Sequence, residues 1–98
     1  METIVERIGE TLEIKVVGRL DTMTSNQLEI VLRQVDDGVH VLIFDFSELE
    51  YLTSVGIRIL ISAHKMMSRQ GKLILRSLNS EVSEVLDITG VLEMFEVE

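Results

Sequence analysis

Two spacings of apolar residues alternate along this chain. Strict alternation over Thr11–Val17 predicts a half-buried strand, and Ile4–Arg7 predicts a short edge strand joined to it by a turn at Gly9. Near-continuous apolar runs at Val39–Phe46 and Lys72–Arg76 are typical of strands that are covered on both faces. Such strands are often parallel, so the pattern favours a sheet of mixed direction.

Between the predicted strands, the apolar residues recur at helical spacing. The first helix is expected from Thr24, as its N-cap, to Val35. Gln27 stands three residues after Thr24, which predicts a capping box. Met23 precedes the cap and is expected to pack on Leu28 as a hydrophobic staple. The start of this helix is therefore predicted in some detail.

The second half of the chain predicts further helices. One is expected from the joint at Thr53-Ser54 to Met67, and another from Ser80 to Gly90. Val91–Val97 is expected to add a last turn and a short strand. Helices that alternate with strands after an initial hairpin predict an α/β domain, with a small mixed sheet of about four to five strands and about four helices against it. The prediction is one domain over residues 1–98.

Ser54 is the most informative single residue of the pattern. It lies beyond the end of a buried strand and at the start of a helix, where functional sites gather in open α/β sheets. Serine is also among the best N-cap residues, and the first helical turn has free N–H groups that favour anions. Such a serine serves as a plain cap, as a nucleophile, or as a site that gains and loses a phosphate. The pattern alone leaves these three roles open.

Composition narrows the classes of function. The net charge is −8, from nine basic and 17 acidic residues, which argues against a nucleic-acid binder and against adsorption to an anionic membrane, and which favours a partner with a basic patch. The chain has no cysteine, so disulfides and thiolate metal sites are excluded. Neither a signal peptide nor a membrane-spanning run is present in the sequence, so a cytoplasmic protein is expected.

Catalysis is not expected at Ser54. A nucleophilic serine needs a base, and neither histidine is expected to reach Ser54. His40 opens its strand at the end opposite the site, and His64 lies ten residues into the helix that begins at Ser54. Asp21 and Asp45 both fall at strand ends, where they form either an acidic rim near Ser54 or ordinary turns. Two carboxylates make no dedicated metal site, and no cofactor is expected.

Several segments in this order resemble the STAS domain, and within it the anti-sigma factor antagonists of bacteria. Thr53-Ser54-Val55-Gly56-Ile57-Arg58-Ile59-Leu60 resembles the family's most diagnostic motif, commonly Asp-Ser-x-Gly-Leu-x-x-Leu. The other landmarks are Gly18-Arg19-Leu20-Asp21, Asp45-Phe46-Ser47 with Leu49, Tyr51 and Leu52, Gly71-Lys72-Leu73, and Ile88-Thr89-Gly90-Val91. The set covers almost the whole chain at the family's spacing.

The resemblance implies a partner switch rather than an enzyme. In that family the unphosphorylated antagonist binds an anti-sigma factor that is also a serine kinase, which frees a sigma factor. The kinase phosphorylates the motif serine, here Ser54, and a serine phosphatase reverses this. The expected partner-binding residues are Asp21, Thr22, Thr24, Thr53, Ser54, Val55, Gly56 and Arg58. Gly56 is expected to leave room for the partner's backbone at the helix entrance.

One residue departs from the family's pattern. Thr53 stands where the family often has aspartate, which keeps a hydrogen-bonding group and loses a charge. This difference is compatible with altered phosphorylation or with a different partner.

Two other classes of function stay open: a STAS scaffold or sensor module for another partner, and a small domain that binds an anionic ligand at the helix start.

Overall fold

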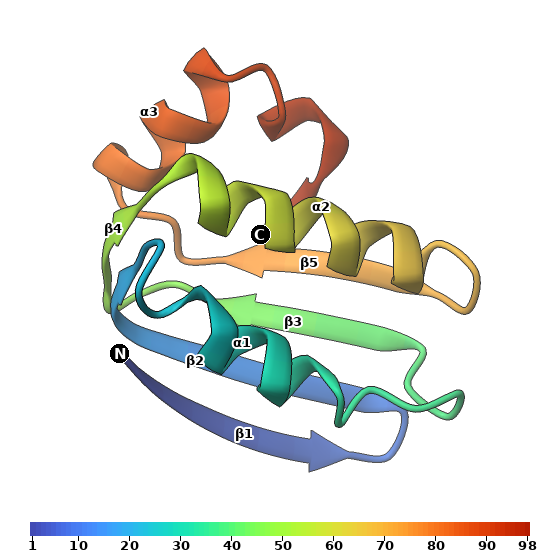
Figure 1. Cartoon of the computed structure of the whole chain (residues 1–98). Coiled ribbons are helices and arrows are strands. Elements are labelled where there is room, and N and C mark those ends of the chain that lie inside the picture. Colours follow the sequence, from blue (N-terminus) through green and yellow to red (C-terminus); the bar gives the residue numbers. More distant parts are fainter.

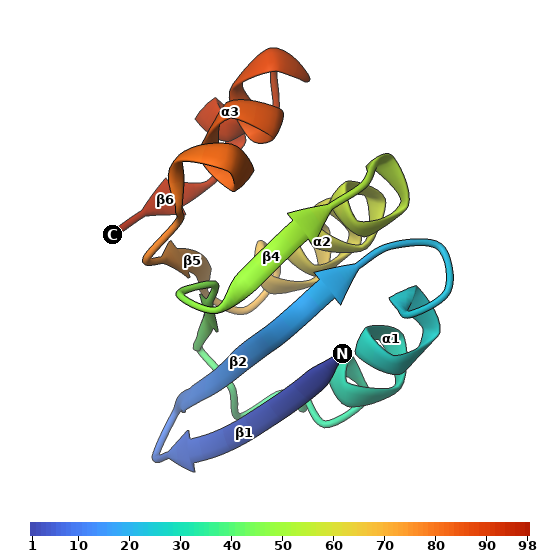
Figure 2. The ribbon, with the colours of Figure 1, turned by 90° about the vertical axis from the view of Figure 1, so that its left-hand side faces the viewer.

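Strand β2 (Thr11–Leu20) is the longest strand and organises the sheet. In the computed structural model, which describes all 98 residues, it pairs antiparallel with β1 (Glu2–Ile8) and parallel with β3 (Val41–Asp45). Two further parallel strands, β5 (Lys72–Arg76) and β6 (Glu96–Val97), continue the order β1-β2-β3-β5-β6, in which Figure 1 shows β1 to β5 and Figure 2 shows β6. The hairpin turn between β1 and β2 is made at Gly9, whose φ is 60°.

The second half of β2 leaves β3 and pairs with a different strand. Gly18, with a φ of 98°, marks an irregularity in the register, and beyond it β2 runs parallel to β4 (Leu49–Leu52). Figure 2 shows β4 beside the distal part of β2. Because β4 leads directly into the next helix, this change of partner sets Leu20 of β2 beside the helix start.

Helices α1 (Ser25–Leu32) and α2 (Ser54–Met67) cover one face of the sheet (Figure 2). Helix α3 (Ser80–Ile88) packs beside β4 and the short 3-10 helix η1 (Leu92–Met94). One core of 21 buried residues joins these helices to the inward-facing side chains of the strands. None of the helices has the length and apolar character that a bilayer crossing requires.

The predicted α/β class with a mixed sheet is confirmed, and the element count is corrected. Six strands form instead of four to five, because β4 lies in what the sequence presents as a short connection. Three α helices and one 3-10 helix form where about four helices were expected. The strand expected over Val39–Phe46 is shorter, with regular pairing only over Val41–Asp45.

The predicted start of α1 is wrong in its side-chain contacts. Thr24 is the N-cap, but its hydroxyl makes no cap hydrogen bond and instead donates to the carbonyl of Arg19 at 2.7 Å. No capping box with Gln27 forms. The staple is absent as well, because Met23 is 88% exposed and does not pack on Leu28. The helix also ends at Leu32, before the predicted end.

Candidate partner-binding site

Ser54 is the first residue of α2 and its side chain is exposed. The expected position at a helix start is confirmed, but the N-cap is Thr53, and Ser54 lies one residue inside the helix. Its hydroxyl makes no hydrogen bond within the protein, and the side chain of Thr53 makes no cap hydrogen bond. The Ser54 hydroxyl is therefore open to a partner and is not used by the fold.

Thr53 fixes this helix start to the end of β2. Its backbone N–H donates to the carbonyl of Leu20 at 3.1 Å, and its hydroxyl makes a long contact of 3.4 Å with the same oxygen. The Thr53 carbonyl then accepts the first helical bond from Ile57 at 3.0 Å. These contacts are structural, and they make Thr53 the residue that aligns Ser54.

Gly56 is buried, which corrects the reason expected for a glycine here. A Cβ at this position would lie 2.7 Å from Leu52 Cδ1 and 2.8 Å from Leu20 Cγ, closer than carbon atoms approach. The position faces the core beneath the helix start rather than the outer surface. Gly56 therefore allows α2 to approach the β2–β4 pair, and its absent side chain makes no room for a partner.

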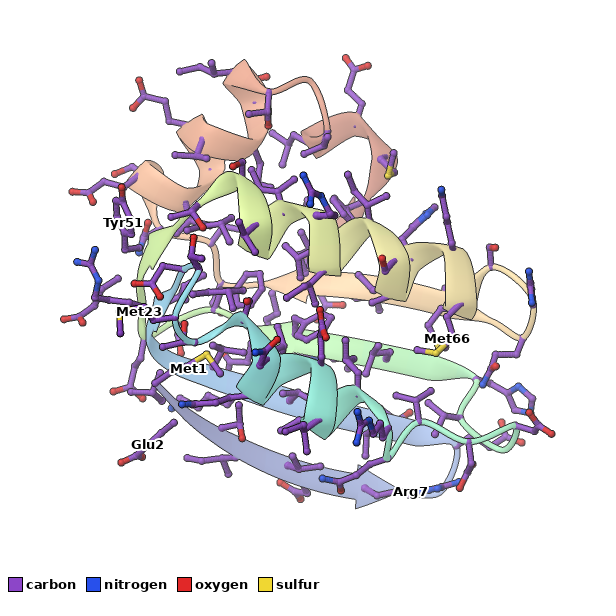
Figure 3. The ribbon with its side chains drawn as sticks, in the orientation of Figure 1. Met1, Glu2, Arg7, Met23, Tyr51 and Met66 are labelled. Carbon is purple, nitrogen blue, oxygen red and sulfur yellow. The ribbon has the colours of Figure 1, made fainter.

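Asp21 builds a rigid turn beside the helix start. Its carboxylate accepts hydrogen bonds from the backbone amides of Met23 at 3.0 Å and Thr24 at 3.2 Å. The Thr24 hydroxyl accepts from the Asp21 amide at 3.0 Å. Between these bonds the turn presents Met23 outward, and Figure 3 shows Met23 and Tyr51 at the same end of the molecule. The prediction that Asp21 forms a turn is confirmed.

The surroundings of Asp21 set its ionisation. Partial burial acts to raise the pKa of Asp21, but hydrogen bonds from the amides of Thr24 and Met23, from the Thr24 hydroxyl and from Arg19 outweigh it. The pKa of this carboxyl is therefore held below its ordinary value of 3.8. The turn is consequently strongest when Asp21 is ionised.

This depressed pKa predicts an acid-sensitive contribution to folding. A carboxyl whose pKa is lower in the folded than in the unfolded state stabilises the fold above the unfolded value, and the contribution is lost as the pH falls through the folded value. Replacing Asp21 by asparagine is expected to make the free energy of unfolding fall less steeply below about pH 4. Urea unfolding at several pH values between about 5 and about 3 measures this. Parallel profiles for the wild type and Asp21→Asn would contradict the assignment.

Arg19 and Tyr51 form a pair that the sequence did not predict. They are directly opposed in the β2–β4 register, and the Arg19 guanidinium carbon lies 4.3 Å from the centre of the Tyr51 ring. Arg19 also contacts Asp21 at 3.5 Å. Since β4 was not predicted as a strand, its cross-strand pairs had no sequence signal. Tyr51 is 46% exposed, so the pair lies at the surface, on the face of the β2–β4 pair opposite Leu20 and Leu52.

The residues expected to contact a partner divide by exposure. Thr22, Ser54 and Arg58 are exposed; Asp21, Thr24, Thr53 and Val55 are half-buried; and Gly56 is buried. The β2–β4 pairing brings the turn after β2 next to the start of α2, so the exposed members share one end of the molecule. No surface hollow of the structure is lined by Ser54. Small-molecule sites are concave, so the shape here suits a protein surface better than a small ligand.

Other candidate groups lie elsewhere. Asp45 faces Lys15 and Arg76 on the sheet face opposite α2, where it accepts a hydrogen bond from the Ser47 amide, so it forms no rim with Asp21. His40 contacts the carbonyl of Gln70 at 2.8 Å, near the end of α2 rather than its start. The His64 ring packs edge-on against Phe95 at 5.6 Å. No three metal-binding side chains are grouped together.

The chain matches a known protein family over almost its whole length. The family model described as the STAS domain matches residues 2–98. The chain belongs to the STAS domain family. A relative in Listeria monocytogenes, named anti-sigma-B factor antagonist, is 31% identical over 97 residues, which cover 96% of this chain and 84% of the relative.

Solved structures of other proteins have the same fold. An anti-sigma factor antagonist from Mycobacterium paratuberculosis is 23% identical and superposes with a TM-score of 0.83, over 98% of this chain and 83% of that one. The Bacillus cell fate determinant SpoIIAA in its phosphorylated form is 19% identical, with a TM-score of 0.76 over 99% of this chain and 91% of that one. At these identities the likeness shows the fold alone.

Proposed function

We propose that this STAS domain is an anti-sigma factor antagonist that is controlled by phosphorylation at Ser54. The unphosphorylated form binds an anti-sigma factor that is also a serine kinase, and this binding releases a sigma factor. Phosphorylation ends the binding, and a serine phosphatase restores it. In this role the protein is not an enzyme, contacts neither nucleic acid nor membrane, and acts in the cytoplasm, where sigma factors and ATP are found.

One observation carries the proposal: the serine of the family motif is exposed, free of hydrogen bonds to the protein, and held at the start of α2 by backbone bonds of its neighbour Thr53. A kinase needs a hydroxyl that it can reach and that the fold does not use. The printed name of the Listeria relative, anti-sigma-B factor antagonist, supports the class of partner.

The covalent step transfers the γ-phosphoryl group of ATP to Ser54. A new bond forms between phosphorus and the serine oxygen, the bond to the ADP oxygen breaks, and the hydroxyl proton goes to a base on the kinase. The phosphatase later transfers the phosphoryl group to water. Phosphorylation adds about −1.5 to −2 charges at pH 7 to a surface that holds only a neutral hydroxyl.

The proposed interface lies around this serine. It consists of the exposed start of α2, with Val55 and Arg58, and of the turn Asp21–Thr24. Arg19 and Tyr51 extend it, because their pair lies on the outer side of the β2–β4 ribbon. Gly56 and Thr53 support this surface from beneath, through packing and backbone bonds.

Ser54 is expected to be the single efficient phosphoacceptor. With the cognate kinase and ATP, the wild type and Thr53→Ala should each gain one phosphate by intact mass, whereas Ser54→Ala should gain none. Thr53→Ala is the matched control, because it removes the adjacent hydroxyl. Equal phosphate incorporation into Ser54→Ala and the wild type would refute the assignment of the acceptor.

The alternative is a STAS scaffold or sensor module that binds another partner or a small anion. A hollow of about 580 Å³ near the start of α3 is lined by Glu48, Glu50 and Glu81, which repel anions. The scaffold gains support if no anti-sigma factor kinase binds, and saturable binding of phosphate or a nucleotide without a partner would favour the anion site.

A further inference from the structure

Arg58 is a cation without a partner on the same helix as Ser54. It is exposed, and it takes part in none of the seven ion pairs of the structure. The first turn of α2 contains no acidic residue that could engage it. Thr53 is neutral as well, so no carboxylate immediately precedes the serine. The start of α2 therefore presents a free positive charge in a protein of net charge −8.

The spacing places this charge within reach of Ser54. Residues four apart on a helix lie on the same face, with about 5–6 Å between their Cβ atoms. The Cα–Cβ bonds of a helix tilt toward its N-terminus, so the Arg58 side chain extends from its own turn back toward that of Ser54. The planar guanidinium donates paired hydrogen bonds to phosphate oxygens.

We propose that Arg58 captures the phosphate on Ser54 in an intrahelical ion pair, so that phosphorylation both adds negative charge and removes a free cation from the partner-binding surface. This inference deepens the proposed function and rests on it for its regulatory meaning. The unphosphorylated surface then fits a partner that offers a carboxylate opposite Arg58. After phosphorylation, that carboxylate faces a phosphate, and its former counterion is occupied.

The neighbouring cation is already engaged. Arg19 lies over the Tyr51 ring at 4.3 Å and contacts Asp21 at 3.5 Å, so moving it to the phosphate would break two contacts. Lys65 belongs to the last turn of α2 and is far from the serine. These two residues provide matched controls in which one positive charge is removed elsewhere.

The test requires no kinase. Phosphoserine is placed at position 54 during synthesis of the protein, and the second ionisation of the phosphate is followed by ³¹P NMR titration, with circular dichroism to verify folding. Removing Arg58 as Arg58→Gln is expected to raise the pKa of the phosphate by about 0.2–0.4 unit, the size of an exposed pair on a helix. Arg58→Lys, which keeps the charge, should recover part of the difference.

The control variants show which cation pairs with the phosphate. Arg19→Gln and Lys65→Gln should leave the titration near that of the phosphorylated wild type, because Arg19 is engaged by Tyr51 and Asp21 and Lys65 lies in the last turn of α2. The acidic groups Asp21, Glu50 and Glu81, of which the two glutamates lie around Tyr51, are present in every variant and so contribute equally. An unchanged titration in Arg58→Gln, or a larger shift in Arg19→Gln, would overturn the proposal. Because the phosphate is installed without a kinase, failure here differs from failure of the proposed function, which appears as absent phosphorylation or absent binding.

Discussion

Replacing Ser54 by aspartate is expected to weaken binding to the anti-sigma factor kinase by about tenfold or more, whereas alanine should leave binding near the wild-type level. Aspartate sets a fixed negative charge on the exposed first residue of α2. A partner surface that is fitted to a neutral hydroxyl then faces a negative charge for which it offers no cation, and such a mismatch at an interface typically costs several kcal/mol. Alanine removes only the hydroxyl, which makes no hydrogen bond within the protein.

Calorimetry with the wild type, Ser54→Ala and Ser54→Asp measures this difference. Ser62→Asp is the matched control, because Ser62 is also exposed on α2 and the substitution adds the same charge. It should bind nearly as well as the wild type. Equal affinity of Ser54→Asp and Ser54→Ala would show that charge at this position does not operate a switch, and the scaffold function would then be favoured.

Gly71→Ala is expected to destabilise the fold by about 3 kcal/mol or more, the range of a severe steric clash in a packed region. A Cβ at Gly71 would lie 1.8 Å from the carbonyl oxygen of His40, which is backbone and cannot rotate away. That same oxygen accepts a hydrogen bond from Lys72 at 3.0 Å. Relief of the clash would therefore separate the beginnings of β3 and β5.

Urea unfolding monitored by circular dichroism measures the loss. Gly9→Ala is the control, because Gly9 has a positive φ of 60° but open space around a Cβ. Its cost is the backbone strain alone, about 1 kcal/mol. A loss of stability in Gly71→Ala no greater than that in Gly9→Ala would show that the approach of His40 to Gly71 is not a constraint.

The sequence predicted those elements whose apolar spacing is long and regular. β2, α2 and α3 were found because their buried residues repeat over two or more turns or several alternations. β4 has four residues, with Leu49 and Leu52 buried and two exposed residues between them, which matches neither period. Its pairing depends on β2 extending past β3, and this is a property of the tertiary structure.

The sequence predicted the central residue of the candidate site, but it did not predict the contacts that hold that residue in place. Ser54 follows from the motif and the helix start, but the local rules for caps predicted the wrong side-chain contacts at Thr24, and the N-cap of α2 is Thr53 rather than Ser54. At Thr24 the hydroxyl bonds to Arg19, a residue of the preceding strand, which no local rule includes. The packing of Gly56 on Leu20 and Leu52 depends on the same long-range approach.

One phosphate on Ser54 is expected to separate this protein from its anti-sigma factor. The most direct measurement is the affinity of one preparation for the kinase before phosphorylation, after complete phosphorylation and after phosphatase treatment, with intact mass recorded at each stage. A switch predicts tight binding, a loss of about tenfold or more, and full recovery. Unchanged affinity in the fully phosphorylated sample would contradict it.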